Sequence, residues 1–351
     1  MKKKGIKPDE YTYGTIVVRL CKEGKVKEAA TVVEDMVKNG LIPKAVTYNT
    51  LIDGYCNKGD IPVAIGLKDE MVKNRVMPTV STFNVLAHAL FLEGSCSDAE
   101  ALIDEMKKHG LVADSITYNI LINGYSQAGN VKKCFDLFDE MSKKGLHPSK
   151  VTYTSLIFVL CRKNRLADAE RVFQEVIKKC LTPDTAIFNA LINGNCHSGN
   201  MDRAFVLFKD MEAMKVAPDE VTYNTLVKGL CLLGKVEEAR VLVEEMKKKG
   251  IIPDNVTFNT LISGYSKRGS MTDALDARDE MLRQGFTPTV LTYNSLIQGL
   301  CENGEGDHAQ ELLGEMVGLG IVPNDRTYFH LIKGKRHLAE VDVDHDTVKS
   351  H

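Results

Sequence analysis

The sequence lacks a net charge of either sign and lacks a long hydrophobic run. Its 351 residues carry 45 lysines and arginines against 47 aspartates and glutamates, a formal net charge of −2. A strongly basic chain would indicate nucleic-acid binding from its charge alone, and this composition does not. No apolar run approaches the roughly 18 residues that a membrane span needs. We therefore expect a soluble protein with no membrane partner.

Cysteine and histidine residues at metal-ligand spacing are also absent. The chain has nine cysteines but no C-x-x-C motif, and His109, His197 and His308 have no partner at ligand spacing. Six cysteines share one register on the apolar face of a predicted helix, which is typical of small core residues in a reducing compartment. These six are Cys21, Cys56, Cys161, Cys196, Cys231 and Cys301. We expect no metal and no cofactor.

A repeated segment dominates the chain instead, and residues 221–254 (VTYNTLVKGLCLLGKVEEARVLVEEMKKKGIIPD) show it most clearly. In its first half Tyr223, Leu226, Val227 and Leu230 fall on one apolar helix face. A second apolar pattern follows Gly234, and the residues GIIP end it. The segment is predicted to form a helical hairpin with too little apolar surface to fold alone.

The same pattern recurs every 35 residues. Nine of the ten prolines keep this step, and so does the aromatic residue that opens each unit. The aromatic series is Tyr13, Tyr48, Phe83, Tyr118, Tyr153, Phe188, Tyr223, Phe258, Tyr293 and Tyr328. Because stacked hairpins bury their apolar faces against one another, the sequence predicts an all-α superhelical solenoid with a long concave groove.

The register divides the chain into one repeat array and a tail. Residues 1–9 match the end of a unit, nine full units occupy 10–324, and a partial unit covers 325–338. Residues 339–351 are polar and are expected to fray. The chain starts inside a second helix without a transit segment, so we expect a fragment of a longer protein. Uncapped end units are expected to fray or to pair with a second copy as a homodimer.

Two polar positions vary while the scaffold positions stay nearly constant. One directly follows the opening aromatic residue, and the other is the last residue of the unit. The first series reads Gly14, Asn49, Asn84, Asn119, Thr154, Asn189, Asn224, Asn259 and Asn294. The second series reads Lys44, Thr79, Asp114, Ser149, Asp184, Asp219, Asp254, Thr289 and Asn324.

Two interpretations of these positions stay open from the residues alone. Asp, Ser, Thr and Asn are ordinary helix N-caps, so capping by itself accounts for the last residue. The asparagine series is harder to explain by structure, because Asn is a poor helix former. A carboxamide offers both donors and an acceptor, which suits the edge of a nucleobase. The asparagines therefore predict a polar ladder along the stacked helices.

The units resemble the pentatricopeptide repeat in its P class. The resemblance rests on the V-T-Y-N-T-L-I opening, the G-Y-C or G-L-C centre and the E-M-x-x-x-G-I-x-P-D ending, and it covers residues 1–338. It implies a right-handed superhelical solenoid of 35-residue helix-turn-helix repeats that binds single-stranded RNA, one base per repeat. The units are most similar to the restorer-of-fertility-like group, which implies RNA processing, stability or translation control in a plant mitochondrion or plastid.

The resemblance also assigns roles to residues. The fifth and last residues of each repeat, which are the two variable series above, choose the base. The second residue packs against the base, and a basic residue late in the first helix binds phosphate. The second residues are Val46, Ile116, Val151, Val221, Val256 and Leu291, with Tyr11, Ser81 and Ala186 in the other units. The basic residues are Lys22, Arg162 and Lys267. Because they are so few, affinity is expected to depend more on base contacts than on charge.

The family's code implies the target 5′-N-Y-U-C-G-U-U-Y-Y-3′. Asn/Asp pairs imply U, the Asn119/Ser149 pair implies C and the Thr154/Asp184 pair implies G. The pairs at Asn49, Asn259 and Asn294 imply a pyrimidine with weak choice. Gly14/Lys44 departs from the code and is unreadable.

Two other function classes compete with RNA binding. A helical-repeat scaffold would hold a protein partner in the same groove. An enzyme is the third alternative, but the zinc deaminase appended to some relatives needs H-x-E and C-x-x-C, and the sequence has neither. We therefore expect a non-enzymatic RNA-binding protein that blocks a nuclease or recruits one.

Overall fold

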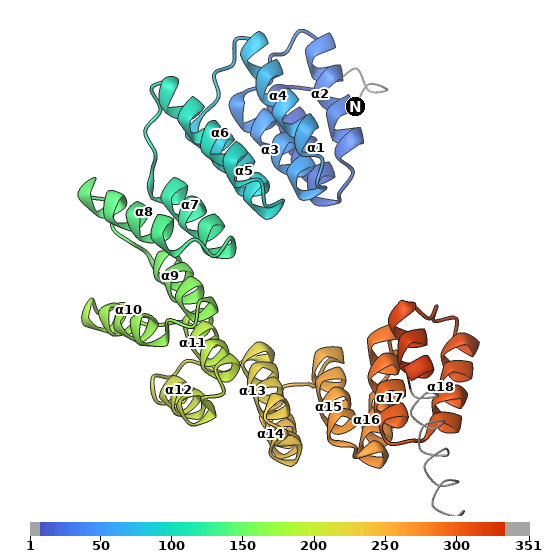
Figure 1. The fold of residues 1–351 in the computed structure, drawn as a ribbon. Helices are drawn as coiled ribbons and strands as arrows, with labels where there is room; N and C mark the ends of the chain where they lie inside the picture. The colour runs from blue at the N-terminus through green and yellow to red at the C-terminus, as the bar shows by residue number, and fades with distance from the viewer. Residues whose placement is uncertain (1–7, 334–351) are drawn as a thin grey trace, which may run out of the picture. The chain divides into compact units, whose positions relative to one another are not determined.

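The computed structural model describes residues 8–333, and these residues form helices joined by short turns, with no strand among them. Figure 1 labels the helices, and a further helical stretch at 325–333 follows α18. The helices are α1 Glu10–Lys22, α2 Val26–Lys38, α3 Ala45–Asn57, α4 Ile61–Lys73, α5 Val80–Leu92, α6 Cys96–Lys108, α7 Ser115–Gln127, α8 Val131–Lys143, α9 Lys150–Arg162, α10 Leu166–Lys178, α11 Thr185–His197, α12 Met201–Ala213, α13 Glu220–Leu232, α14 Val236–Lys248, α15 Asn255–Arg268, α16 Met271–Arg283, α17 Val290–Glu302 and α18 Gly306–Gly318. The predicted all-α repeat fold is confirmed.

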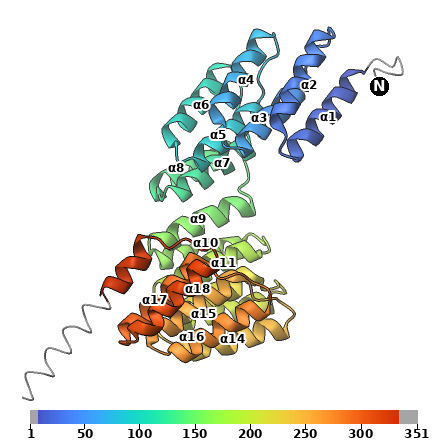
Figure 2. The same ribbon diagram turned by 90° about the vertical axis from the view of Figure 1, so that its right-hand side faces the viewer.

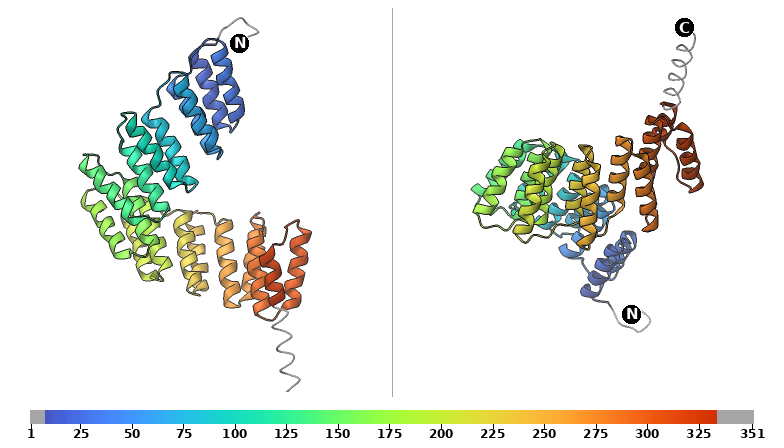
Figure 3. Two further views of the ribbon diagram at one scale, coloured as in Figure 1. Left: turned by 45° about the horizontal axis from the view of Figure 1, so that its top comes forward. Right: turned by 90° about the horizontal axis from the view of Figure 1, so that it is seen from below.

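The chain divides into two compact units. The first comprises residues up to Lys163 together with Arg171–Val176, and the second comprises Asn164–Glu170 and the residues from Ile177 onward. Within each unit the first helices of successive repeats contact one another, α1 to α3 to α5 to α7 to α9 in one and α11 to α13 to α15 to α17 in the other. The second helices pack on the outside of this row, as Figures 2 and 3 show for the helix pairs of each unit.

The boundaries of each hairpin follow from local sequence. Each odd-numbered helix begins at the residue predicted to open its repeat, and glycine in the left-handed region usually ends the helix, as at Gly234 with φ of 74°. Arg75, Asn164, Cys180 and Lys215 occupy such turns with φ between 55° and 59°. The turns therefore keep their shape where glycine is missing, at a cost in backbone strain.

The core is built from the residues that recur at the 35-residue step. The opening aromatic residues of the nine full repeats are buried, with Tyr223 and Phe83 at 0% exposure, whereas Tyr328 is 50% exposed. Methionine near the end of the second helix is fully buried in eight repeats, and Val176 takes that place in one repeat. The tyrosine hydroxyl reaches an acidic residue of its own second helix, as in Tyr118 to Glu140 at 2.7 Å. The ring is thus buried while its polar tip is satisfied.

Glycines in the middle of the first helices allow those helices to stack closely. A Cβ added at Gly229 would lie 2.8 Å from the Cys196 sulfur and 2.7 Å from the Met201 sulfur. A Cβ at Gly264 would lie 2.8 Å from the Cys231 sulfur. Cys196 and Cys231 are therefore packing residues of the repeat interface, as predicted.

Burial also makes these thiols unreactive. Desolvation raises the pKa of Cys196 to about 12 and that of Cys231 to about 11. A thiol with such a pKa stays protonated at neutral pH and is a poor nucleophile and metal ligand.

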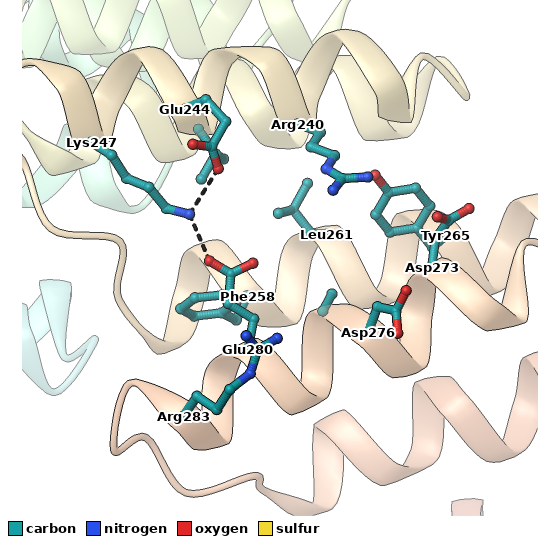
Figure 4. A pocket seen from close by; sticks show the side chains of 12 residues that line it. Arg240, Glu244, Lys247, Phe258, Leu261, Tyr265, Asp273, Asp276, Glu280 and Arg283 are labelled. Carbon is teal, nitrogen blue, oxygen red and sulfur yellow. Dashed lines mark hydrogen bonds and ion pairs between the residues drawn. The ribbon is translucent and has the colours of Figure 1, made fainter.

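Ion pairs connect the second helices of neighbouring repeats. Lys68 of α4 contacts Glu105 of α6 at 2.6 Å, and Lys247 of α14 contacts Glu280 of α16 at 2.6 Å. Figure 4 shows the cavity of about 280 Å³ around the second pair, where Lys247 also contacts Glu244 at 2.8 Å.

Among the described helices, none has the length and apolar character that crossing a bilayer requires.

Two glycine substitutions should have opposite effects on stability. Gly229→Ala overpacks the interface between α11 and α13 and should lower the unfolding free energy by about 1–3 kcal/mol. Gly14→Ala meets no atom within 4 Å of its new Cβ, so it should raise stability by about 0.5–1 kcal/mol through better helix propensity. Urea unfolding at constant m value measures both. Equal effects of the same sign would contradict this account of the close packing.

Candidate nucleic-acid interface

The fifth residue of each repeat lies on the first helix, and its amide is held by hydrogen bonds to residues on both sides. The asparagines that follow the opening aromatic residue, which we call the Asn ladder, are Asn49, Asn84, Asn119, Asn189, Asn224, Asn259 and Asn294. Asn84 and Asn294 are buried at 6% and 5% exposure, and the other five are half-buried. In the five half-buried residues, one edge of the carboxamide is therefore accessible and the rest of the side chain is covered.

The amide nitrogen of six ladder residues donates to the last residue of the same repeat. Asn189 reaches Asp219 and Asn224 reaches Asp254, each with 3.1 Å between Nδ2 and Oδ1. The other four distances are 3.3 Å for Asn49 to Thr79, 3.4 Å for Asn84 to Asp114, 3.3 Å for Asn119 to Ser149 and 3.2 Å for Asn294 to Asn324. Because a carboxylate only accepts, the nitrogen side of the amide must face the aspartates.

The last residue of each repeat is also the N-cap of the next first helix. The Asp254 carboxylate accepts the backbone N–H of Thr257 at 2.9 Å, and Asp219 accepts that of Thr222 at 2.9 Å. The capping interpretation of the last residue is therefore confirmed. The same side chain caps the first helix of the next repeat and contacts the ladder residue of its own repeat.

A third residue completes the contact, and the sequence analysis missed it. The threonine three residues into the next first helix donates its hydroxyl to the ladder oxygen Oδ1. We call these the third-residue threonines. The distances to Oδ1 are 2.7 Å from Thr82 to Asn49, 2.9 Å from Thr117 to Asn84, 2.5 Å from Thr152 to Asn119, 2.7 Å from Thr222 to Asn189, 2.6 Å from Thr257 to Asn224, 2.6 Å from Thr292 to Asn259 and 2.7 Å from Thr327 to Asn294. The signal was in the V-T-Y-N opening, where this threonine recurs with Ile187 as the exception.

These contacts determine which polar groups are left over. In an Asn/Asp pair such as Asn224/Asp254, Oδ1 of each side chain is engaged. One amide N–H and the second carboxylate oxygen remain unused by these contacts. The pair thus presents one donor and one acceptor side by side.

The capping carboxylates stay ionised at neutral pH. For Asp114, Asp219 and Asp254, burial raises the pKa, but hydrogen bonds from the following threonine and the ladder amide outweigh it, so the net pKa lies below the ordinary value. A charged carboxylate accepts hydrogen bonds strongly and cannot donate. These three carboxylates therefore act only as hydrogen-bond acceptors at neutral pH.

Exposed apolar residues flank the ladder. The second residues of the repeats are accessible, with Val46 at 73%, Ile116 at 60% and Val221 at 52% exposure. Val151, Val256 and Leu291 are exposed to a similar degree, at 56–57%. These side chains are free to pack against a flat ring.

Three surface cavities contain the predicted residues. One of about 330 Å³ is lined by Asn84, Asp114 and Ile116, and one of about 210 Å³ by Asn259, Leu291 and Lys267. The third, of about 580 Å³, includes Tyr11, Gly14, Lys44 and Val46. The first and third cavities thus bring second, fifth and last residues together, and the cavity at Asn259 joins a fifth and a second residue with the basic Lys267.

The three basic residues differ in their surroundings. Lys22 and Lys267 are exposed in the last turns of α1 and α15. Arg162 donates to the Gln127 carbonyl oxygen and lies 5.6 Å from the centre of the Phe158 ring. Arg162 is therefore partly engaged within the protein.

Two repeats depart from the ladder. Gly14 has no side chain, and Lys44 forms an ion pair with Glu10 at 2.9 Å. The Thr154 hydroxyl donates to the Lys150 carbonyl oxygen at 2.8 Å. Its only hydrogen is thus engaged by its own helix, and Thr154 offers an acceptor where the ladder offers a donor.

Within residues 8–333, no cluster of three or more His, Cys, Asp or Glu side chains is placed to hold a metal ion.

Comparison with known proteins identifies the fold and its family. The profile described as the PPR repeat family matches residues 43–91, 88–127, 113–162, 183–232, 218–267, 253–302 and 288–335, and PPR repeat profiles match 4–37 and 151–181. The architecture is that of a helical-repeat solenoid. This chain belongs to the PPR, or pentatricopeptide repeat, family.

Individual proteins are similar to this chain over different shares of its length. A pentatricopeptide repeat-containing protein of Arabidopsis thaliana is 56% identical over 36 residues, which is 10% of this chain and 6% of that protein. The maize protein PPR10 matches 100% of this chain at 24% identity with a TM-score of 0.64. PPR10 in complex with an 18-nucleotide psaJ RNA element matches 95% at 26% identity with a TM-score of 0.74. The chain spans 54–60% of the length of PPR10.

The capping carboxylates predict a pH dependence of stability. Because the folded-state pKa of Asp254 is lowered, its stabilisation is present above the unfolded-state pKa of about 3.9 and is lost as the pH falls through the folded-state value. Asn caps as well as Asp but does not titrate. The variant with Asp114, Asp219 and Asp254 all replaced by Asn should therefore lose less stability than the parent between about pH 6 and pH 3. Urea unfolding over this range measures the difference, and parallel curves would contradict the lowered pKa values.

Proposed function

We propose that this protein binds single-stranded RNA in a sequence-specific manner, one nucleotide per repeat, and acts by binding rather than by catalysis. The observation that carries the proposal is the paired donor and acceptor left by the Asn ladder and the last residues, repeated at a 35-residue step and flanked by exposed apolar side chains. The solved PPR10 structure in complex with an 18-nucleotide RNA element supports it.

Single strands suit this surface better than duplexes. Sequence-specific RNA recognition generally reads unstacked bases on their Watson–Crick edges, which a duplex hides. The exposed second residues Val221 and Val256 offer apolar surface to base faces on either side of the Asn224/Asp254 pair.

The unused polar groups account for the choice between uracil and cytosine. Uracil presents an N3–H donor and the O4 acceptor, which match the free Asp254 oxygen and the free Asn224 N–H. Cytosine has an unprotonated N3 and an N4 amine, so it needs a donor where uracil needs an acceptor. The Ser149 hydroxyl accepts from Asn119 and lies 3.2 Å from the Thr152 hydroxyl, and unlike a carboxylate it carries a hydrogen that can supply that donor. These matches support U at the Asn/Asp repeats and C at Asn119/Ser149.

Thr154 supports a different base. Its hydroxyl hydrogen is engaged by Lys150, which leaves lone pairs for a base that donates. Guanine carries donors on its Watson–Crick edge, and the shorter side chain leaves room for a purine. The full proposed target is 5′-N-Y-U-C-G-U-U-Y-Y-3′.

The proposal extends to cellular role. The sequence motifs of the repeats support a restorer-of-fertility-like function in RNA processing, stability or translation control, in a plant mitochondrion or plastid. Bound protein would block a nuclease or recruit one, and the end repeats would pair two copies as a homodimer. The array assigned to residues 1–338 is the part of the chain that carries these roles.

A scaffold for a protein partner is the second candidate, and the structure offers a reason to rank it lower. A protein-binding groove needs no repeated hydrogen-bond pattern. Here six of the seven ladder residues donate to the last residue of their repeat, which would be unexplained by protein binding.

RNA form and sequence separate the two candidates. A single-stranded oligonucleotide carrying the target should bind at least tenfold more tightly than a scrambled one of the same composition, since each mismatched position typically costs about 1–3 kcal/mol. The same target annealed to its complement should bind far more weakly. Gel-shift or fluorescence anisotropy titration measures all three affinities. Equal affinity for single strand and duplex would overturn the proposal.

Substitution of Thr154 tests the reading of a single base. Thr154→Asn replaces an acceptor with a donor, so the preference at the fifth nucleotide of the target should change from G to U. Competition between two oligonucleotides that differ only at that nucleotide should show at least a tenfold change in relative affinity. The preference at the nucleotides read by Asn189/Asp219 and Asn224/Asp254 serves as the internal control. If both oligonucleotides weaken equally, Thr154 supports the fold and does not read the base.

A further inference from the structure

The third-residue threonines form contacts that neither the capping nor the base-reading role explains. Seven of them donate to a ladder oxygen that belongs to the repeat before their own. Thr222 and Thr257 are fully buried at 0% exposure, so neither can touch a ligand directly. Their effect on a ligand must pass through the asparagine.

The direction of this hydrogen bond is fixed by the backbone. The N–H of the last residue donates to the threonine oxygen, as in Asp254 to Thr257 at 3.2 Å and Asp219 to Thr222 at 3.2 Å. The threonine oxygen therefore acts as an acceptor for the backbone and has one hydrogen to give. Two acceptors lie within reach of that hydrogen, and the ladder oxygen, at 2.6 Å from Thr257, is nearer than Asp254 Oδ1, at 3.0 Å.

The amide is thereby held at both ends. On the Asn224 side chain, Oδ1 accepts from Thr257 while one Nδ2 hydrogen donates to Asp254. The second Nδ2 hydrogen is left pointing away from both partners. Without the threonine, only the hydrogen bond to Asp254 holds the amide, and Oδ1 is free to accept from another donor.

At one repeat boundary the sequence lacks both the ladder asparagine and the third-residue threonine that would contact it. The position 33 residues after Thr154 holds Ile187, whereas the position 33 residues after every ladder asparagine holds threonine. Ile187 is fully buried and has no hydroxyl. Thr47, which follows Gly14 by the same interval, shows that threonine also occurs without a ladder partner.

We propose that each third-residue threonine with a ladder partner is a positioning residue, which sets the base preference of the preceding repeat by keeping the asparagine oxygen engaged so that the amide N–H meets the base. The proposal rests on the function proposed above. Thr257 acts on the nucleotide read by Asn224/Asp254, and Thr222 acts on the nucleotide read by Asn189/Asp219. Specificity at one nucleotide is therefore determined by three residues in two consecutive repeats.

The test is the ratio of affinities for U and C at a single nucleotide. Thr257→Val removes the hydroxyl at nearly constant volume and frees the Asn224 oxygen, which then accepts from the N4 amine of cytosine. The preference for U over C at the seventh nucleotide of the target should fall about tenfold. The preference at the sixth nucleotide, read by Asn189/Asp219, should stay as in the parent protein.

Two further variants make this result specific. Thr257→Ser keeps the hydroxyl and should restore the preference for U. Thr222→Val should produce the same loss one nucleotide earlier and leave the seventh nucleotide unaffected, so it replaces the first variant if Thr257→Val does not fold. Thr47→Val removes a third-residue threonine that has no ladder partner and should change the preference at no nucleotide. Circular dichroism shows whether each variant keeps its helices.

The outcomes separate this proposal from the proposed function. A folded Thr257→Val protein that binds U and C targets with the parent's ratio, or that weakens both equally, assigns Thr257 a purely structural role and overturns the inference. A parent protein with no base preference at any nucleotide overturns the proposed function itself. The two failures are distinguished by measuring the parent first.

Discussion

The hydrogen bonds at the start of each first helix connect the fold to the candidate site. A last residue such as Asp254 caps α15, holds the amide of Asn224 and keeps one oxygen free. The cap fixes where the helix starts, and the helix start fixes the position of the next threonine and asparagine. Because one set of contacts does both, a shift of register by a single residue would break the helix cap and the contact with the ladder asparagine together. This requirement explains why the 35-residue step is kept through the whole array.

The same arrangement explains how a nearly neutral protein can be proposed to bind a polyanion. Counterion release by lysine and arginine supplies affinity without sequence choice. Only three basic residues are predicted to contact phosphate. Lys22, Arg162 and Lys267 are all exposed, but Arg162 also donates to the Gln127 carbonyl oxygen. The ionised carboxylates of Asp114, Asp219 and Asp254 also repel phosphate groups electrostatically. Binding must then come from apolar packing on the second residues and from matched hydrogen bonds, so a mismatched base has little general attraction to compensate for it.

Much of the fold could be predicted from the sequence because it depends on local signals that recur. Apolar spacing placed the helices, and the positions after proline placed their first residues, so α13 begins at Glu220 as the repeat boundaries required. The cysteines could be assigned to the core for the same reason. The close contact of Gly229 with Cys196 could not be predicted, because it depends on the distance between stacked helices and not on the pattern within one unit.

The candidate site divides in the same way. The second, fifth and last residues could be identified because they vary on a constant background or match a known repeat. The role of Thr257 was missed because it is constant and its partner, Asn224, lies 33 residues earlier in another repeat. A repeat position that holds threonine with a single exception looks like scaffold in one sequence. Only the geometry shows that it shares a hydrogen bond with a residue that is proposed to read a base.

Selection of bound sequences from a random pool of single-stranded RNA tests the central claim most directly. The ladder predicts an ungapped consensus with one position per repeat, in which U, C, G, U and U occur consecutively for the repeats that begin at residues 80, 115, 150, 185 and 220. Enrichment of this order from 5′ to 3′ would support the assignment of each pair to its base. A pool without a consensus, or a consensus whose length does not follow the number of repeats, would contradict it.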